Sequence, residues 1–368
     1  MEVMRAAADR EATGGEVLHL EVGQPSTPAP RGAIEAAQGA LEADRLGYTN
    51  ALGLDALRAR IAQHYRDWYG ATVGVDDVAV TMGASGACVL AFLASFDPGD
   101  RVAVMSPGYP CYRNMLEAFD IEVVDIAVDA STRFQPTAGL LAEHAPLHGV
   151  VVASPSNPTG TMLSADELAR LRDHCDTNGT RLISDEIYHG SGYPDRGATA
   201  WRPDGSAIVV NSFSKYFSMT GWRLGWMLMP QQLHGAVERL AQNLFIAAPT
   251  LSQFAGLAAF DCTDELEANV TVYRQNRAIL LEGLPRAGID RLAPADGAFY
   301  VYAQVDHLTS DSQALCASWL NELGIAATPG VDFDPARGHE FVRFSFAGAP
   351  ADMHAAMDRL RGWSRELR

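Results

Sequence analysis

The sequence predicts an α/β fold with two parts. A large domain is built on a seven-stranded, mostly parallel sheet sandwiched by helices, and a smaller α+β domain follows it. Between residues 78 and 262, short continuous apolar runs alternate with helix-like stretches, which is typical of parallel strands buried on both faces. After residue 262 the pattern changes to one long polar helix and then separate strands and helices. The 368 residues, 48% of them apolar, suffice for two such cores.

The first segment, residues 1–34, is expected to be an N-terminal arm that joins the small domain. Residues 17–22 have the composition of a short strand. Three prolines between residues 23 and 30 then prevent regular structure. We therefore expect this part of the chain to be extended.

Residues 35–262 are expected to form the large domain. Its strand candidates are residues 78–81, 101–105, 121–128, 150–153, 181–184, 208–210 and 226–229. The helix candidates around them are residues 34–46, 54–69, 84–96, 113–118, 165–177 and 231–247. Because the strand candidates are apolar throughout, helices should cover both faces of the sheet.

Residues 263–368 are expected to form an interdomain helix and the small C-terminal domain. The helix candidates here are residues 264–284, 312–323 and 351–366, and the strand candidates are residues 298–303 and 341–346. Strands and helices that are separated in this way are typical of an α+β domain.

The composition excludes several kinds of partner. The chain has 28 basic and 45 acidic residues, a net charge of −17, so it should repel nucleic acid and anionic membranes. Its five cysteines are scattered without the spacing of metal ligands, which favours reduced thiols and no metal site. The N-terminus lacks an apolar stretch typical of a signal peptide. We expect a cytoplasmic protein.

Lysine is almost missing from this chain, since 27 of the basic residues are arginine and only Lys215 is lysine. An amine, unlike a guanidinium group, can lose its proton and attack a carbonyl. Ser212, Ser214 and Lys215 follow a strand candidate, and Arg223 lies eight residues further on. Two hydroxyls and an arginine can bind a phosphate, and the cation would lower the pKa of the amine. A Schiff-base cofactor that carries a phosphate needs this combination.

The spacing from Ser212 to Lys215 also matches the Ser-x-x-Lys motif of acyl-serine hydrolases. That class of enzyme needs a second lysine in a Lys-Thr-Gly motif. The chain has no second lysine, which argues strongly against the hydrolase reading.

Residues 212–215 together with residues 221–225 (Gly-Trp-Arg-Leu-Gly) resemble the lysine signature of the class I/II aminotransferases, enzymes of fold type I that depend on pyridoxal 5'-phosphate. Matching segments extend from Gly23 to Arg343 in the order found in that family. The resemblance implies an aspartate-aminotransferase-like fold and a Schiff base between Lys215 and the cofactor. It also implies a homodimer with shared active sites.

The resemblance implies a role for each motif of the cofactor site. The cofactor phosphate would be bound by residues that offer hydroxyls, backbone N–H groups or a guanidinium group: Ala84, Ser85, Ser212, Ser214, Arg223 and, from the neighbouring subunit, Tyr48. The cofactor ring would be stacked by Tyr109 and held by polar side chains, namely Asn157 and Tyr188 at its phenolic oxygen and Asp185 at its ring nitrogen. The catalytic residues would be Lys215, Asp185 and Tyr188.

For the substrate, the resemblance implies that Gly23 lies against it and that Asn157 and Arg343 bind its carboxylate. An arginine can bind a carboxylate through two parallel hydrogen bonds. No cation can be assigned to a second carboxylate, although Arg113 is a candidate by sequence. We therefore expect neutral or apolar amino donors, with 2-oxoglutarate or pyruvate as the acceptor.

The resemblance implies transfer of an amino group from an L-amino acid to a 2-oxo acid. The same fold also hosts β-elimination, the reaction of carbon–sulfur lyases, and the motifs do not separate the two reactions. A third alternative is a transcriptional sensor that binds the cofactor without catalysis. Such a sensor carries a DNA-binding domain before the fold, and we expect none here because the matching segments begin by Gly23.

Overall fold

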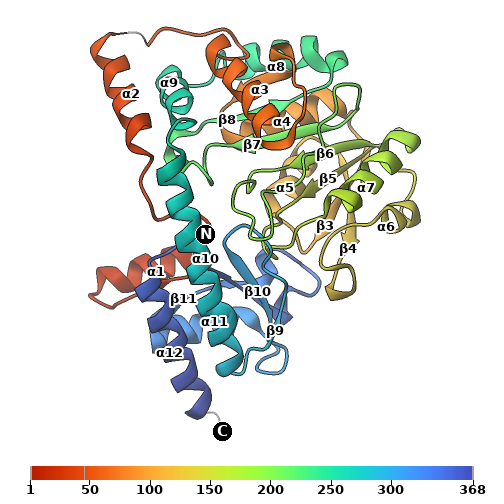
Figure 1. Ribbon diagram of the computed structural model, residues 1–368. Helices are drawn as coiled ribbons and strands as arrows, with labels where there is room; N and C mark the ends of the chain where they lie inside the picture. Colours follow the sequence, from red (N-terminus) through yellow and green to blue (C-terminus); the bar gives the residue numbers. More distant parts are fainter. Residues whose placement is uncertain (1, 45, 367–368) are drawn as a thin grey trace.

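The computed structural model describes residues 2–44 and 46–366, and it consists of two main sheets with their covering helices (Figure 1). The larger sheet contains β2 (Val78–Thr81), β3 (Arg101–Ser106), β4 (Glu122–Ala127), β5 (Gly149–Ala153), β6 (Arg181–Asp185), β7 (Ile208–Ser212) and β8 (Gly225–Leu228). Their order is β2-β8-β7-β6-β5-β3-β4, and only β8 runs antiparallel to its neighbours. The predicted α/β fold with a seven-stranded, mostly parallel sheet is confirmed.

Helices cover both faces of this sheet. They are α3 (Asp55–Tyr69), α4 (Gly83–Ser95), α5 (Pro110–Ala118), α6 (Ala138–Glu143), α7 (Ala165–Asn178) and α8 (His234–Leu244). Successive residues of β5 belong to different cores: Val150 and Val152 pack in one, Val151 in the other. Each strand thus needs apolar side chains on both faces, which explains its continuous apolar sequence.

A four-stranded antiparallel sheet forms the second layer, in the order β12-β13-β10-β9. Its strands are β9 (Arg291–Leu292), β10 (Tyr300–Gln304), β12 (Thr328–Pro329) and β13 (Phe341–Ser345). The helices around it are α10 (Thr263–Arg286), α11 (Ser312–Ser318) and α12 (Pro350–Glu366). The long helix α10 runs from the upper part of the molecule down to this sheet and packs against α12 (Figure 1).

The N-terminal residues are attached to the C-terminal part of the chain. Strand β1 (Leu18–His19) pairs in parallel with β11 (Ile325–Ala326). Two further helices, α2 (Arg31–Glu42) and α9 (Thr250–Ala259), pack along each other at the edge of the larger unit (Figure 1). The boundaries that we expected at residues 34 and 262 remain predictions.

Residues 2–12 form a helix, α1 (Glu2–Ala12), which the sequence analysis did not predict. Most of α1 is exposed, but Ala7 is buried against Leu320 and Ala326. This contact with a distant part of the chain stabilises a helix whose own sequence has only a narrow apolar stripe. Within the described residues, no helix is long and apolar enough to cross a membrane.

Candidate active site

A cavity of about 910 Å³ lies between the two sheets, beyond the C-terminal ends of β6 and β7. Open α/β sheets bind ligands at this end of their strands. Most of the residues expected in the site line this cavity: Gly23, Ala84, Ser85, Tyr109, Asn157, Asp185, Tyr188, Ser214, Lys215, Arg223 and Arg343. The structure therefore brings together side chains that are up to 320 residues apart in the sequence (Gly23 and Arg343).

Lys215 follows β7 and extends its amine into the cavity, where Nζ donates a hydrogen bond to Gly23 O at 2.5 Å. Burial lowers the pKa of Lys215 to about 8, and the positive charge of Arg343 adds to this effect, whereas Asp185 opposes it. A much larger fraction of the amine is thus neutral at pH 7 than for an exposed lysine. A neutral amine is the form that attacks carbonyl carbons.

The end of the cavity near Arg223 has the features of an anion site. Arg223 has a left-handed backbone, φ 50°, and its exposed guanidinium group donates a hydrogen bond to Thr220 O at 3.1 Å. Gly83 has φ 70°, and a Cβ atom there would lie 2.6 Å from Arg223 Nη2. Only glycine lets the arginine come this close to the start of α4.

The first residues of α4 add to this anion site. No side chain within the described residues caps this helix, so its first N–H groups are free to bind a negative ligand. Ala84 and Ser85 belong to this first turn and line the cavity. Ser214 lines it too, but the structure does not bring Ser212 there. The Ser212 hydroxyl instead donates to Ser214 Oγ at 2.9 Å and lies 3.0 Å from Leu224 O.

Asp185 ends β6 and lies at the bottom of the cavity, almost completely buried. Burial raises its pKa, while hydrogen bonds from Tyr112 Oη, at 2.5 Å, and from the backbone N of Ile187, at 3.0 Å, act in the opposite direction. Both bonds favour the charged carboxylate. Such a group can pair with a protonated ring nitrogen.

Tyr109 presents a flat surface above this carboxylate end of the cavity. It precedes α5, and 41% of its surface remains exposed although it is a large aromatic residue. Its ring packs edge-on against Tyr112, with centroids 5.5 Å apart and an interplanar angle of 83°. One face of Tyr109 can therefore stack on a planar ligand, a contact worth about 0.5–1.5 kcal/mol beyond burial.

Arg343 lies in β13 on the opposite side of the cavity and is buried. Nη1 donates to Asn157 Oδ1 at 2.8 Å, and Nη2 donates to Glu21 O at 2.6 Å. Nε finds no hydrogen-bond partner among the described residues. An unpaired buried donor is costly. Because Arg343 lines the cavity, its guanidinium group can bind a ligand carboxylate there.

Two candidates from the sequence do not reach the cavity within this single chain. Tyr48 is 84% exposed and lines a separate surface hollow with Thr250 and Phe254. Arg113 pairs with Asp125 and does not line the cavity, so it offers no free cation for a substrate. Nor does the described part of the chain contain a cluster of three His, Cys, Asp or Glu side chains that could hold a metal ion.

The sequence analysis missed two tyrosines of this site. Tyr112 donates to Asp185, and Tyr300 forms a hydrogen bond of 2.6 Å with Tyr188. A signal existed for Tyr112, since it lies three residues after Tyr109 and thus on the same side of a helix. For Tyr300 the sequence offers no such signal, because its partner is 112 residues away.

Comparisons with known proteins agree with this geometry. The family model described as "Aminotransferase class I and II" matches residues 15–360. A valine–pyruvate aminotransferase from Mycobacterium tuberculosis is 53% identical over 368 residues, which cover 99% of this chain and 95% of that protein. An aspartate/prephenate aminotransferase from Thermus thermophilus is 31% identical and covers 96% of this chain and 92% of its own. The crystal structure of an aminotransferase from Mycobacterium tuberculosis superposes with a TM-score of 0.97, at 52% identity, over 100% of this chain and 96% of that one.

Proposed function

We propose that this chain, which belongs to the class I and II aminotransferases, uses a neutral, apolar L-amino acid such as valine as its amino donor. Enzymes of this family depend on pyridoxal phosphate and move an amino group from an amino acid to a 2-oxo acid. The positively charged residues that line the cavity are the observation that supports a neutral donor. Among the described lining residues the cations are Lys215, Arg223 and Arg343. Each has a role in binding the cofactor or the α-carboxylate, so no cation is left for a second carboxylate.

The remaining lining agrees with an apolar substrate side chain. Val3 and Met4 of α1 line the cavity, as do Met115, Phe119 and Ile187. Burial of a valine side chain against such a surface contributes about 1.5–3 kcal/mol. The acidic residues Glu21 and Asp332 would repel a second carboxylate, and Asp332 has the smaller effect because it is exposed and screened by water, whereas Glu21 is buried. We propose pyruvate as the acceptor, in line with the name of the 53% identical relative.

The residues present fit pyridoxal 5'-phosphate. Gly83 makes room for Arg223, the free N–H groups of α4 and the Ser214 hydroxyl suit a phosphate, and Asp185 suits a ring nitrogen. When bound, the cofactor supplies an aldehyde that condenses with amines and a protonated ring that withdraws electrons from the reacting carbon. Lys215 Nζ is the amine that would hold it.

We propose the following roles for the chain's own groups. Arg343 and Asn157 hold the substrate carboxylate, which fixes the substrate Cα near Lys215. With the substrate amine in place of its own, Lys215 Nζ would act as a general base that takes the proton from the substrate Cα. It would then act as a general acid that gives this proton to the carbon that carries the cofactor's aldehyde. Asp185 keeps the ring nitrogen protonated, and Tyr188 donates a hydrogen bond to the phenolic oxygen.

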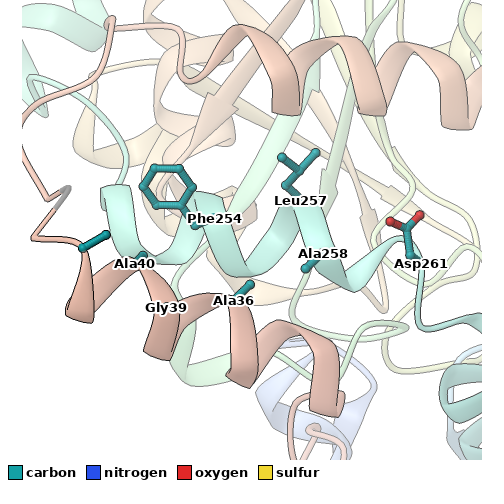
Figure 2. Close-up of a pocket in the computed structure, with 8 residues that line it drawn as sticks. Ala36, Gly39, Ala40, Phe254, Leu257, Ala258 and Asp261 are labelled. Atoms are coloured by element: carbon teal, nitrogen blue, oxygen red, sulfur yellow. The ribbon is translucent and has the colours of Figure 1, made fainter.

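We propose that the active enzyme is a homodimer. Exposed apolar side chains gather near α2, including Ile34, Leu41 and Tyr48. A hollow between α2 and α9, lined by small residues and by Phe254 and Leu257, lies on the same edge (Figure 2). A second copy seated there would cover these groups and could bring its Tyr48 to the phosphate site.

The described cysteines are all free, and we propose a cytoplasmic location on that ground.

An absorbance experiment tests the proposed donor. The protein is loaded with pyridoxal phosphate and mixed with valine, alanine, aspartate or glutamate, and pyruvate or 2-oxoglutarate is then added. We expect valine to convert the cofactor to its amine form and pyruvate to restore it, with kcat/KM at least about tenfold higher for valine than for aspartate. Arg113→Ala should leave this ratio unchanged, because Arg113 already pairs with Asp125. A preference for aspartate would contradict the proposal. Release of ammonia and pyruvate from cysteine, whose Cβ carries a sulfur leaving group, without formation of the amine form of the cofactor would contradict it too and would indicate β-elimination.

A further inference from the structure

The hydroxyl group of Tyr300 lies where the two sheets of the molecule meet. Tyr300 is the first residue of β10 in the four-stranded sheet, and Tyr188 follows β6 in the seven-stranded sheet. Their hydroxyl oxygens are 2.6 Å apart, and both side chains are almost completely buried. A hydrogen bond between two buried hydroxyls is shielded from water and is therefore costly to break.

The N-terminal segment contacts the same hydroxyl. A Cβ atom at Gly23 would collide with Tyr300 Oη, so a glycine is required for this close approach. Gly23 O in turn accepts the hydrogen bond from Lys215 Nζ at 2.5 Å. One backbone segment thus contacts both the amine of Lys215 and the phenol of Tyr300.

The ring of Tyr300 has a second contact, with Arg343. The guanidinium carbon of Arg343 lies 4.4 Å from the centroid of the Tyr300 ring and 4.8 Å from that of Phe333. Contacts of this kind between a guanidinium group and aromatic rings are favourable, more so when they are desolvated. Tyr300 therefore touches two groups that the proposed function places on the cofactor and on the substrate.

We propose that Tyr300 is a positioning residue, whose hydroxyl strengthens Tyr188 as a hydrogen-bond donor and whose ring holds Arg343 in place. The inference rests on the proposed function, in which Tyr188 donates to the phenolic oxygen of the cofactor. When Tyr300 donates to Tyr188 Oη, the proton of Tyr188 stays free to be donated into the site. Hydrogen bonds in such a chain strengthen one another by roughly 10–30%.

The other charged and titratable groups around this pair belong to the same site. They are Arg343 from β13, Lys215 from the loop after β7, Asp185 from β6, and Tyr109, which precedes α5. A single substitution of Tyr300 leaves all of these groups in place. A shift in the absorbance titration of such a variant therefore reports the contacts that Tyr300 itself has lost.

The test is a pH titration of the loaded enzyme by absorbance, which follows the proton on the linkage between Lys215 Nζ and the cofactor. Tyr300→Phe removes the hydroxyl and keeps the ring. We expect its midpoint to rise by about 0.5 pH unit, since weaker donation by Tyr188 leaves the phenolic oxygen more basic and better able to hold that proton. KM for valine should change less than about twofold, because Arg343 keeps its aromatic contact. Tyr300→Leu removes the ring as well and should raise KM about tenfold.

Tyr302→Phe is the matched control. Tyr302 lies two residues further along β10, is buried, and its hydroxyl finds no partner among the described residues. Its loss should leave the midpoint unchanged. Because Tyr300 acts through Tyr188, Tyr300→Phe should add no further shift in a Tyr188→Phe background.

Three results would overturn the inference: an unchanged midpoint in Tyr300→Phe, an equal shift in Tyr302→Phe, or additive shifts in the double variant. Should Tyr300→Phe fail to fold, replacement of Tyr300 by 3-fluorotyrosine keeps the shape and makes the phenol a stronger donor. The midpoint should then fall, and a rise or no change would count against the inference. Absence of a cofactor band in the unmodified protein would instead refute the proposed function itself.

Discussion

The amine of Lys215 lies in the wall of a cavity where burial disfavours its charged form more than Asp185 favours it. The nearby cations Arg343 and Arg223 act in the same direction as burial. The pKa of Lys215 therefore falls to about 8, which makes the residue a better nucleophile near neutral pH than an exposed lysine.

This pKa can be measured directly, because the chain has one lysine. The protein without cofactor is treated briefly with an amine-acylating reagent at pH 6 to 11, and the modified peptides are identified by mass spectrometry. Modification of Lys215 should increase with pH around a midpoint of about 8. Arg343→Gln removes a neighbouring positive charge and should move that midpoint upward. A midpoint near the ordinary value of about 10.5 in the unmodified protein would contradict the account.

Most of the site residues that single motifs predicted line the cavity, because each motif places its side chain at the end of a strand or the start of a helix. Lys215 after β7 and Asp185 at the end of β6 are examples. Pairings between distant segments could not be predicted in this way. The bonds from Tyr112 to Asp185 and between Tyr300 and Tyr188 depend on how whole elements pack.

Among the elements, the strands of the larger sheet were predicted to within two residues at each end, because an apolar run buried on both faces has an unambiguous pattern. Helix α1 was missed. Its sequence has only a narrow apolar stripe, and the contact that buries Ala7 involves residues more than 300 positions away. The short strand β1 was predicted, since it lies within residues 17–22, but its pairing with β11 was not, because that partner comes late in the chain.

His19 connects α1 to β1 through two carboxylates. Nδ1 lies 2.9 Å from Glu21 Oε1, and Nε2 lies 3.2 Å from Glu11 Oε1. Partial burial acts to lower the pKa of His19, but the hydrogen bonds with Glu21 and Glu11 outweigh it, and the pKa is raised. A protonated His19 thus holds α1, which contributes Val3 and Met4 to the cavity.

The stability that comes from His19 should therefore depend on pH. A histidine whose pKa is higher in the folded than in the unfolded protein stabilises the fold fully below its unfolded pKa of about 6.5. This stabilisation is lost as the pH rises through the higher pKa of the folded protein. We expect His19→Gln to lower the thermal unfolding midpoint at pH 5.5 and to have little effect at pH 9. The control His354→Gln, at an exposed position of α12, should have no such pH dependence. An effect of His19→Gln that grows with pH would contradict this assignment.

For the whole molecule, the account requires a second copy at the edge formed by α2 and α9 (Figure 2). Leu41 in α2 is 54% exposed in the single chain. We expect Leu41→Glu to shift the protein from dimer to monomer in sedimentation velocity, because a charge would be buried without a partner. The monomeric variant should also bind pyridoxal phosphate more weakly, since Tyr48 would no longer reach the phosphate site of a partner subunit.

Val75→Glu is the control for this prediction. Val75 is 38% exposed, similar to the exposure of Ile34, and lies in the short turn before β2 instead of in α2 or α9. The Val75→Glu substitution should leave both the oligomeric state and the affinity for pyridoxal phosphate unchanged. A monomeric unmodified protein with full cofactor affinity would show that the site is complete without a partner.

The most direct test of the central claim follows nitrogen from donor to acceptor. The loaded enzyme is incubated with [15N]valine and pyruvate, and the alanine formed is analysed by mass spectrometry. The account predicts [15N]alanine from the unmodified enzyme and none above background from Lys215→Arg, which keeps the charge and approximate volume but has no amine to take the Cα proton. Label transfer by Lys215→Arg at a rate near that of the unmodified enzyme would contradict the role given to Lys215.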